Sequence, residues 1–351
     1  MSEAPLLSVP KVELHVHLPG CVRPTTLAEL SSRYGVELPA PAEELYRRVN
    51  SAPAPGEDDG GPWFPLLRVY ELICSCLRSA EDFARVVYEA LEDAYTSSNV
   101  RYQELSVSPS VHMSMGVPWV TIAEGLGEGV RAAEHDHGLQ AAFIVAIDRE
   151  DTPSVAAQMV SEVLAHRAPE VVAVGMDFDE RLGPPEAFAE AYRLARSGGL
   201  RATAHAGEHV EGRPGAANII TCLDVLGCER IDHGYHVLAD EEVVKRCRDE
   251  EVPFDVAFTT SRRSLRPWRR QCVAAMFGSG LNVNLSSDDP ALFPTTVAHE
   301  FSVAQNELGL SGPQLSAMVK SGVQASFLPQ DQRQRFLAQV EAALTQTGDE
   351  L

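Results

Sequence analysis

Short apolar runs recur along the chain, and stretches with helical periodicity lie between most of them. In the first run Val12 and Leu14 alternate with Glu13, as in a strand. We expect eight strands, at Lys11–His17, Val100–Val107, Ala141–Ala146, Glu170–Met176, Arg201–His205, Arg230–His233, Pro253–Phe258 and Leu281–Leu285. Eight strands alternating with helices predict an α/β fold, a (β/α)8 TIM barrel, with residues 1–351 as one domain.

Extra helices are expected near the active face and at the C-terminus. An early helix is predicted from roughly Thr25 to Tyr34, and a longer helical run from near Trp63 towards Ser97. Two more are predicted at Gln314–Ser321 and Asp331–Gln346. The segment 39–62 is rich in turn residues and charges, which predicts an exposed loop. This loop and the helix after it are candidates for a lid over the active face.

Composition excludes several classes of protein. No apolar run approaches the ~20 residues that span a bilayer, and no basic-then-apolar leader begins the chain, so we expect a cytoplasmic protein without a membrane partner. A formal charge of −21 argues against binding nucleic acid. The seven cysteines show no Cys-x-x-Cys spacing, which indicates reduced thiols rather than a zinc knuckle or redox site.

Histidine and carboxylate side chains stand at the ends of four predicted strands. His15 and His17 end the first strand, and two residues apart in a strand share one face. The others follow the fifth, sixth and eighth strands, and they are His205, Glu208, His233, Asp288 and Asp289. The carboxyl ends of barrel strands meet at one face, where the chemistry is located. We therefore expect one site.

Three imidazoles and a carboxylate form a ligand set that suits zinc. The predicted ligands are His15, His17, His205 and Asp288. Such a metal lowers the pKa of a water in an open position towards ~7. His233 can accept or share the proton of that water, Glu208 can donate one to a ring nitrogen, and Asp289 and His17 can bind the substrate. The fourth strand has no lysine to bridge two metals, so we expect one Zn²⁺ per subunit.

Four motifs, in this order, resemble the adenosine deaminase family of metal-dependent hydrolases. They are Pro-Lys-Val-Glu-Leu-His-Val-His-Leu at 10–18, His-Ala-Gly-Glu at 205–208, His-Gly-Tyr-His at 233–236 and Ser-Asp-Asp-Pro at 287–290. The resemblance covers nearly the whole chain. It implies a zinc-bearing barrel that replaces the exocyclic amine of a purine with oxygen and releases ammonia. It also implies that the matching residues bind zinc, protonate the ring, assist the water and bind the purine, as their chemistry suggests.

The chain departs from this family where substrate contacts are expected. Pro19 stands where the family commonly has an Asp that contacts the ribose end. The segment after Asp177 is shorter than the family's Asp-Leu-Ala-Gly-Asp-Glu, so no purine contact is assigned there. The loop after strand seven carries Arg262, Arg263, Arg266, Arg269 and Arg270. These arginines suit either an anionic group on the substrate or surface ion pairs with the surplus carboxylates.

The sequence thus predicts an aminohydrolase, an enzyme that hydrolyses the C–N bond of a cyclic amidine. The expected partner is a small purine nucleoside, adenosine or a modified adenosine, converted to an inosine-type product and ammonia. The alternative substrate is an adenosine derivative that carries a phosphate or carboxylate at its 5′ position. Two other hypotheses are a non-catalytic nucleoside-binding relative and a barrel hydrolase that cleaves an amide or ester. The presence of Glu208 and His233 argues against the binder.

Overall fold

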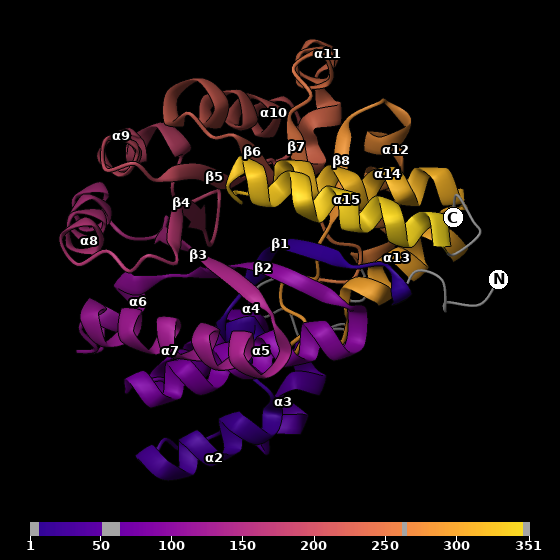
Figure 1. Cartoon of the computed structure of the whole chain (residues 1–351). Helices are drawn as coiled ribbons and strands as arrows, with labels where there is room; N and C mark the ends of the chain where they lie inside the picture. Colours follow the sequence, from indigo (N-terminus) through magenta and orange to yellow (C-terminus); the bar gives the residue numbers. More distant parts are fainter. Residues whose placement is uncertain (1–6, 51–63, 262–264, 347–351) are drawn as a thin grey trace.

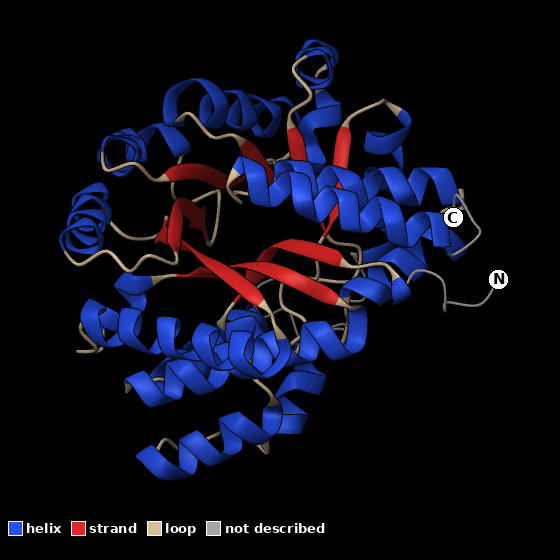
Figure 2. Cartoon of the chain, viewed as in Figure 1, coloured by secondary structure: helices blue, strands red, loops and turns tan. Residues whose placement is uncertain are grey.

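The strands form an eight-stranded parallel barrel. The computed structural model describes residues 7–50, 64–261 and 265–346. The strands are β1 (Lys11–His17), β2 (Val100–Val107), β3 (Gln140–Asp148), β4 (Val171–Asp177), β5 (Arg201–Ala206), β6 (Arg230–His233), β7 (Pro253–Val256) and β8 (Asn282–Leu285). They pair in sequence order from β1 to β8, at the centre of a layer of helices (Figure 2). The predicted TIM barrel is confirmed, and its strand bounds differ from the predicted ones by at most a few residues.

Side chains on both faces of the strands are buried, which explains the nearly continuous apolar runs in the sequence. All seven residues of β1 are buried, and Phe143, Val145 and Ile147 of β3 are at most 1% exposed. The apolar core therefore lies inside the barrel and between the barrel and its helices. None of the described helices is long and apolar enough to cross a membrane.

The helices surround the barrel, and several extra ones precede β2 (Figure 1). Before β2 lie the turn η1 (Pro19–Cys21) and α2 (Pro24–Tyr34), α3 (Ala42–Val49), α4 (Phe64–Cys76) and α5 (Ala80–Ser98). Later connections carry α6 (Pro109–Ser114), α7 (Trp119–His137), α8 (Pro153–Ala165), η2 (Pro185–Phe188), α9 (Ala189–Ser197), α10 (Gly212–Thr221), η3 (Cys222–Leu226), η4 (Tyr235–Ala239), α11 (Glu241–Asp249) and α12 (Arg266–Gly278). After β8 come α13 (Val297–Asn306), α14 (Gly312–Ala325) and α15 (Gln330–Gln346).

Two predictions for the segment before β2 need correction. The long helical run is two helices, because Ser79 caps α5 in a capping box with Asp82. The predicted loop 39–62 contains α3, whose Leu45, Tyr46 and Val49 are buried. The turn residues around it concealed this short amphipathic pattern, and residues 51–63 lie outside the described part.

The barrel closes where the chain after β8 meets β1. Asp288 forms a parallel bridge with Val16. The amide of His17 donates to the carbonyl of Asp288 at 2.8 Å, and the amide of Asp288 donates to the carbonyl of His15 at 3.1 Å. The hydroxyl of Ser286 accepts from the amides of Leu14 and His15 at 3.3 and 3.2 Å. The last strand is thus joined to the first by backbone hydrogen bonds.

A buried arginine ties several strands together inside the barrel. Arg230 on β6 donates to Glu104 of β2 at 2.5 Å, forms an ion pair with Asp255 of β7 at 2.8 Å, and donates to the carbonyl of Leu14 at 2.9 Å. Its guanidinium lies 4.3 Å from the ring centroid of Phe327, which follows α14. Both ion pairs are fully buried.

We expect Arg230→Met to lower the free energy of unfolding by about 3–5 kcal/mol, because Glu104 and Asp255 lose their buried counter-charge. Urea unfolding of the full chain measures the change. The exposed pair of Arg246 with Asp224 provides the control, and Arg246→Met should cost no more than about 1 kcal/mol. Equal losses for the two variants would contradict the role of Arg230.

Candidate metal centre and active site

The closure of the barrel brings His15, His17 and Asp288 to one point, and β5 brings His205 beside them. The Nε2 atoms of His15 and His17 lie 3.1 and 3.2 Å from Nε2 of His205. The same two nitrogens lie 3.3 and 3.2 Å from Oδ1 of Asp288. Four atoms around an ion with bonds of about 2.0–2.1 Å in tetrahedral geometry are separated by about 3.3 Å. These side chains therefore have the spacing and chemistry to hold a zinc-sized ion.

The other ring nitrogen of each histidine faces an oxygen. Nδ1 of His15 lies 3.2 Å from the carbonyl of Asp255, and Nδ1 of His205 lies 3.4 Å from Oδ2 of Asp232. Nδ1 of His17 lies 3.6 Å from Oδ2 of Asp177. An acceptor at Nδ1 favours the proton there, which leaves the Nε2 lone pair for a metal. A hydrogen bond therefore orients His15 as a ligand, and the facing carboxylates of Asp232 and Asp177 favour the same orientation for His205 and His17.

His233 is a second candidate for the fourth ligand position. His15, His205, His233 and Asp288 offer ligand atoms within 4.8 Å of one another. Nε2 of His233 is 3.8 Å from Oδ2 of Asp288 and 3.3 Å from Oε2 of Glu208. His17 has two contacts at 3.2 Å to members of the cluster, so these shorter distances favour His17 as the ligand. His233 lies between the cluster and Glu208.

Backbone strain is concentrated at this site. Phe178, His233 and Asp288 adopt positive φ angles of 66°, 71° and 65°. Left-handed conformations cost non-glycine residues of order 1–3 kcal/mol each, and they persist where the surrounding structure requires them. All three residues line the same pocket, so the strain directs side chains towards it.

Glu208 and His233 form a buried pair that can handle protons. Burial raises the pKa of Glu208 to about 7, although the neighbouring guanidinium of Arg269 opposes this rise. Burial also holds the pKa of His233 well below its usual value. Near neutral pH, Glu208 can therefore carry a proton to donate, while His233 is neutral and can accept one.

The loop that carries Glu208 is held by a carboxylate that the sequence analysis did not identify. Glu180 accepts hydrogen bonds from the four successive amides of residues 207–210, at 2.8–3.2 Å, and from Nδ2 of Asn218 at 2.9 Å. Its position just after β4 was the available signal, because strand ends face the active site. Glu180 acts on the backbone, so its residue type alone suggested no role.

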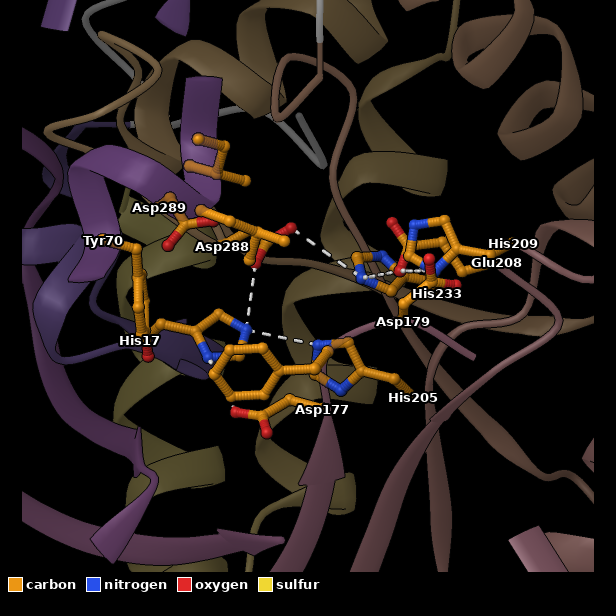
Figure 3. A pocket seen from close by; sticks show the side chains of 13 residues that line it. His17, Tyr70, Asp177, Asp179, His205, Glu208, His209, His233, Asp288 and Asp289 are labelled. Carbon is orange, nitrogen blue, oxygen red and sulfur yellow. Dashed lines mark hydrogen bonds and ion pairs between the residues drawn. The ribbon is translucent and has the colours of Figure 1, made fainter. Parts of the chain in front are cut away.

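A pocket opens onto the proposed metal position (Figure 3). It is lined by His17, Leu66, Leu67, Tyr70, Asp177, Phe178, Asp179, His205, Glu208, His209, His233, Asp288 and Asp289. Helix α4 supplies the apolar side chains Leu66, Leu67 and Tyr70, which makes this helix a cover of the pocket, at the position where the sequence suggested a lid. His209 lines the pocket, whereas His236 packs against Trp268.

Asp289 lies beside the cluster, with its carboxylate in the pocket. Its Oδ1 atom has no hydrogen-bond partner among the described residues. Burial and the neighbouring Asp288 raise the pKa of Asp289 to about 7. Gly20 packs so closely that a Cβ there would meet Oδ1 of Asp289 at 2.1 Å. Asp289 thus lines the pocket, and its buried Oδ1 atom is packed against Gly20.

Arg266, Arg269 and Arg270, which the sequence analysis placed in the loop after β7, lie instead in α12, and they do not line the pocket. Arg266 donates to the carbonyls of Thr259 and Ser261 at 3.0 and 3.2 Å. Arg270 pairs with Glu307, as the surface interpretation predicted, while Arg269 pairs with Glu208. Residues 262–264 lie outside the described part. Pro19 is buried in η1, and Asp177 accepts from the hydroxyl of Ser108 at 2.9 Å.

Comparisons with known proteins identify the family of the chain. A family model described as adenosine deaminase matches residues 10–343. An adenine deaminase of Streptomyces coelicolor is 33% identical over 345 residues, covering 96% of each chain. The adenine deaminase structure from Arthrobacter aurescens is 29% identical with a TM-score of 0.86, covering 96% of this chain and 99% of that one. An amidohydrolase from Burkholderia ambifaria with bound zinc is 30% identical with a TM-score of 0.87, covering 99% and 94%. The chain therefore belongs to the adenosine deaminase family of hydrolytic deaminases, as its motifs predicted.

Proposed function

We propose that the protein is a zinc-dependent aminohydrolase that converts a 6-aminopurine to the 6-oxopurine and ammonia. The observation that carries this proposal is the position of the Glu208–His233 pair. It lies directly beside the buried cluster of His15, His17, His205 and Asp288, and members of the pair and of the cluster line one pocket. A water activated at the cluster and a proton donor at the ring are the two requirements of this hydrolysis.

The proposed ligands of one Zn²⁺ are His15, His17, His205 and Asp288. When bound, zinc lowers the pKa of a water towards ~7 and so supplies the nucleophile near neutral pH. The spacing of the four ligand atoms and the oriented imidazoles support this assignment.

The chain's own residues then move the protons. His233 accepts a proton from the attacking water, which forms the C–O bond at C6 of the purine. Glu208 donates its proton to the adjacent ring nitrogen, and Asp289 holds the opposite edge of the base. His233 then passes its proton to the amino group, so that the C6–N bond breaks and ammonia leaves. The hydroxyl at C6 returns a proton to Glu208 as it becomes the carbonyl of the product. The apolar side chains of α4 exclude bulk water from these transfers.

Free adenine is the substrate that we favour, ahead of adenosine. The relatives compared above include adenine deaminases, and Pro19 has no side-chain hydrogen-bonding group for a ribose. The described pocket lining holds five carboxylates and no Lys or Arg, which would repel a 5′-phosphate or carboxylate. Adenosine, and then an anionic adenosine derivative, remain the alternatives that the substrate test separates.

Removal of a ligand should remove the metal. We expect His205→Ala to lose most of its bound zinc, because three of four ligand atoms cannot complete the site. Elemental analysis of the purified full chain gives the metal content. His166→Ala changes an exposed histidine at the C-terminal end of α8 and should keep about one zinc per chain. Equal zinc content in the two variants would reject the proposed ligand set.

Glu208→Gln should lower kcat by about 10²–10⁴-fold, because glutamine has no proton to donate to the ring. Ammonia release measures kcat, and zinc analysis confirms that the site is still loaded. The exposed Glu241→Gln is the matched control and should behave like the unmodified enzyme. A Glu208→Gln variant with unchanged turnover would favour a non-catalytic role for this carboxylate.

A panel of substrates decides which purine is processed. We expect kcat/KM for adenine to exceed that for adenosine and for adenosine monophosphate by at least about tenfold, since each added group meets a pocket without a matching contact. Ultraviolet spectroscopy and ammonia release follow the reaction. Preference for adenosine would assign the nucleoside instead. Preference for the monophosphate would indicate that the arginines after β7 bind the phosphate. Hydrolysis of amides or esters alone would refute deamination.

A further inference from the structure

We propose that Arg269 is a positioning residue that leaves one nitrogen of His233 and one oxygen of Glu208 free to exchange protons with the reactants. This inference rests on the proposed function and extends it to a residue outside the four motifs. Arg269 lies in the first turn of α12, the helix after β7, and its guanidinium contacts Glu208 directly and His233 only through Tyr235.

The two arms of the guanidinium have different partners. Nη2 of Arg269 donates to Oε1 of Glu208 at 2.5 Å, and Nη1 donates to the hydroxyl of Tyr235 at 3.2 Å. The same guanidinium lies 4.9 Å from the ring centroid of Tyr235. The side chains of Arg269 and Glu208 are 4% and 3% exposed. The buried guanidinium of Arg269 therefore contacts Glu208 directly and is linked to His233 through the hydroxyl of Tyr235.

The hydrogen-bond inventory at Tyr235 determines the proton position on His233. The tyrosine hydroxyl has one hydrogen to donate, and it donates to the carbonyl of Ala257 at 2.9 Å. Arg269 can only donate, so it occupies an acceptor position of the same oxygen. Nδ1 of His233 lies 3.2 Å from this hydroxyl, which has no second hydrogen to give. Nδ1 must therefore carry the proton and donate it.

The consequence is a free lone pair on Nε2 of His233. This nitrogen faces Oε2 of Glu208 at 3.3 Å and the pocket beyond it. Oε1 of Glu208 accepts from Arg269, so we place the mobile proton on Oε2, which also lies 3.4 Å from Nδ1 of His209. Arg269 thus leaves one basic nitrogen and one acidic oxygen free, side by side and next to the predicted ligands.

Arg269 differs from the neighbouring arginine of the same helix in where its partner lies. A cation near the start of a helix is disfavoured by the helix dipole, so its placement requires a compensating partner. Its neighbour on the same helix, Arg270, finds that partner at the surface in Glu307, away from the pocket. Arg269 instead extends into the site, where a lysine could supply the charge but not the two-armed geometry.

Kinetics of substituted enzymes test the proposal. Arg269→Ala and Arg269→Lys should lower kcat by roughly 10²-fold, with a much smaller change in KM, because the proton-handling pair loses its alignment. Guanidinium chloride at low millimolar concentration should restore part of the activity of Arg269→Ala. Arg270→Gln should match the unmodified enzyme in all these measurements. Full activity of Arg269→Lys, or a loss that appears only in KM, would overturn the proposal.

The tautomer of His233 provides a readout that does not depend on turnover. In the zinc-loaded full chain labelled with ¹⁵N-histidine, the His233 resonances are assigned by their absence from His233→Asn. We expect a protonated Nδ1 and an unprotonated Nε2, and a mixture of tautomers in Arg269→Ala and Tyr235→Phe. A protonated Nε2 in the unmodified protein would refute the inference even if purines are deaminated. Conversely, the expected tautomer in a protein that deaminates no purine would support the arrangement and reject the proposed function.

Discussion

The backbone hydrogen bonds between β1 and the chain after β8 are the interaction on which the site depends. They link Asp288 to the carbonyl of His15 and to the amide of His17, so closing the barrel also assembles three of the predicted ligands. A shift of one residue in this pairing would turn the histidines to the opposite face of the strand. The fold and the proposed metal site are therefore not separable features, because the same hydrogen bonds determine both.

Buried charged side chains form two groups in the barrel, one around Arg230 and one at the pocket. At one, Arg230 neutralises Glu104 and Asp255 and ties the strands together. At the other, several carboxylates converge on imidazoles and on Arg269, with strained backbone at the strand ends. Burying this many acidic groups is costly unless a positive charge offsets them. A bound cation would supply that charge, which agrees with the spacing of the ligand atoms.

The features that depend on local sequence pattern, such as the bounds of the strands, were predicted well from the sequence. Strand ends were predicted to within a few residues because the apolar runs of parallel strands are bounded by turn residues. The helix at Pro24–Tyr34 was also located, with its start one residue from the predicted one. The break at Ser79 and the helix Ala42–Val49 were missed because a single cap and a short amphipathic turn are weak signals within a long run. The roles of Glu180 and Arg269 were not predicted, because their partners are distant in sequence: Glu180 had only its position after β4, and Arg269 was one of five arginines with no indication of its partner.

The sequence by itself determined the fold class, the family and the set of chemical groups at the strand ends, because motif spacing and strand periodicity are local properties. Only the tertiary structure decided which nitrogens and oxygens meet, that α4 covers the pocket, and that Arg269 faces Glu208 rather than solvent. These outcomes depend on how the helices pack around the barrel. A run of arginines after β7 looks the same in the sequence whether its side chains face a phosphate, a surface carboxylate or a catalytic one.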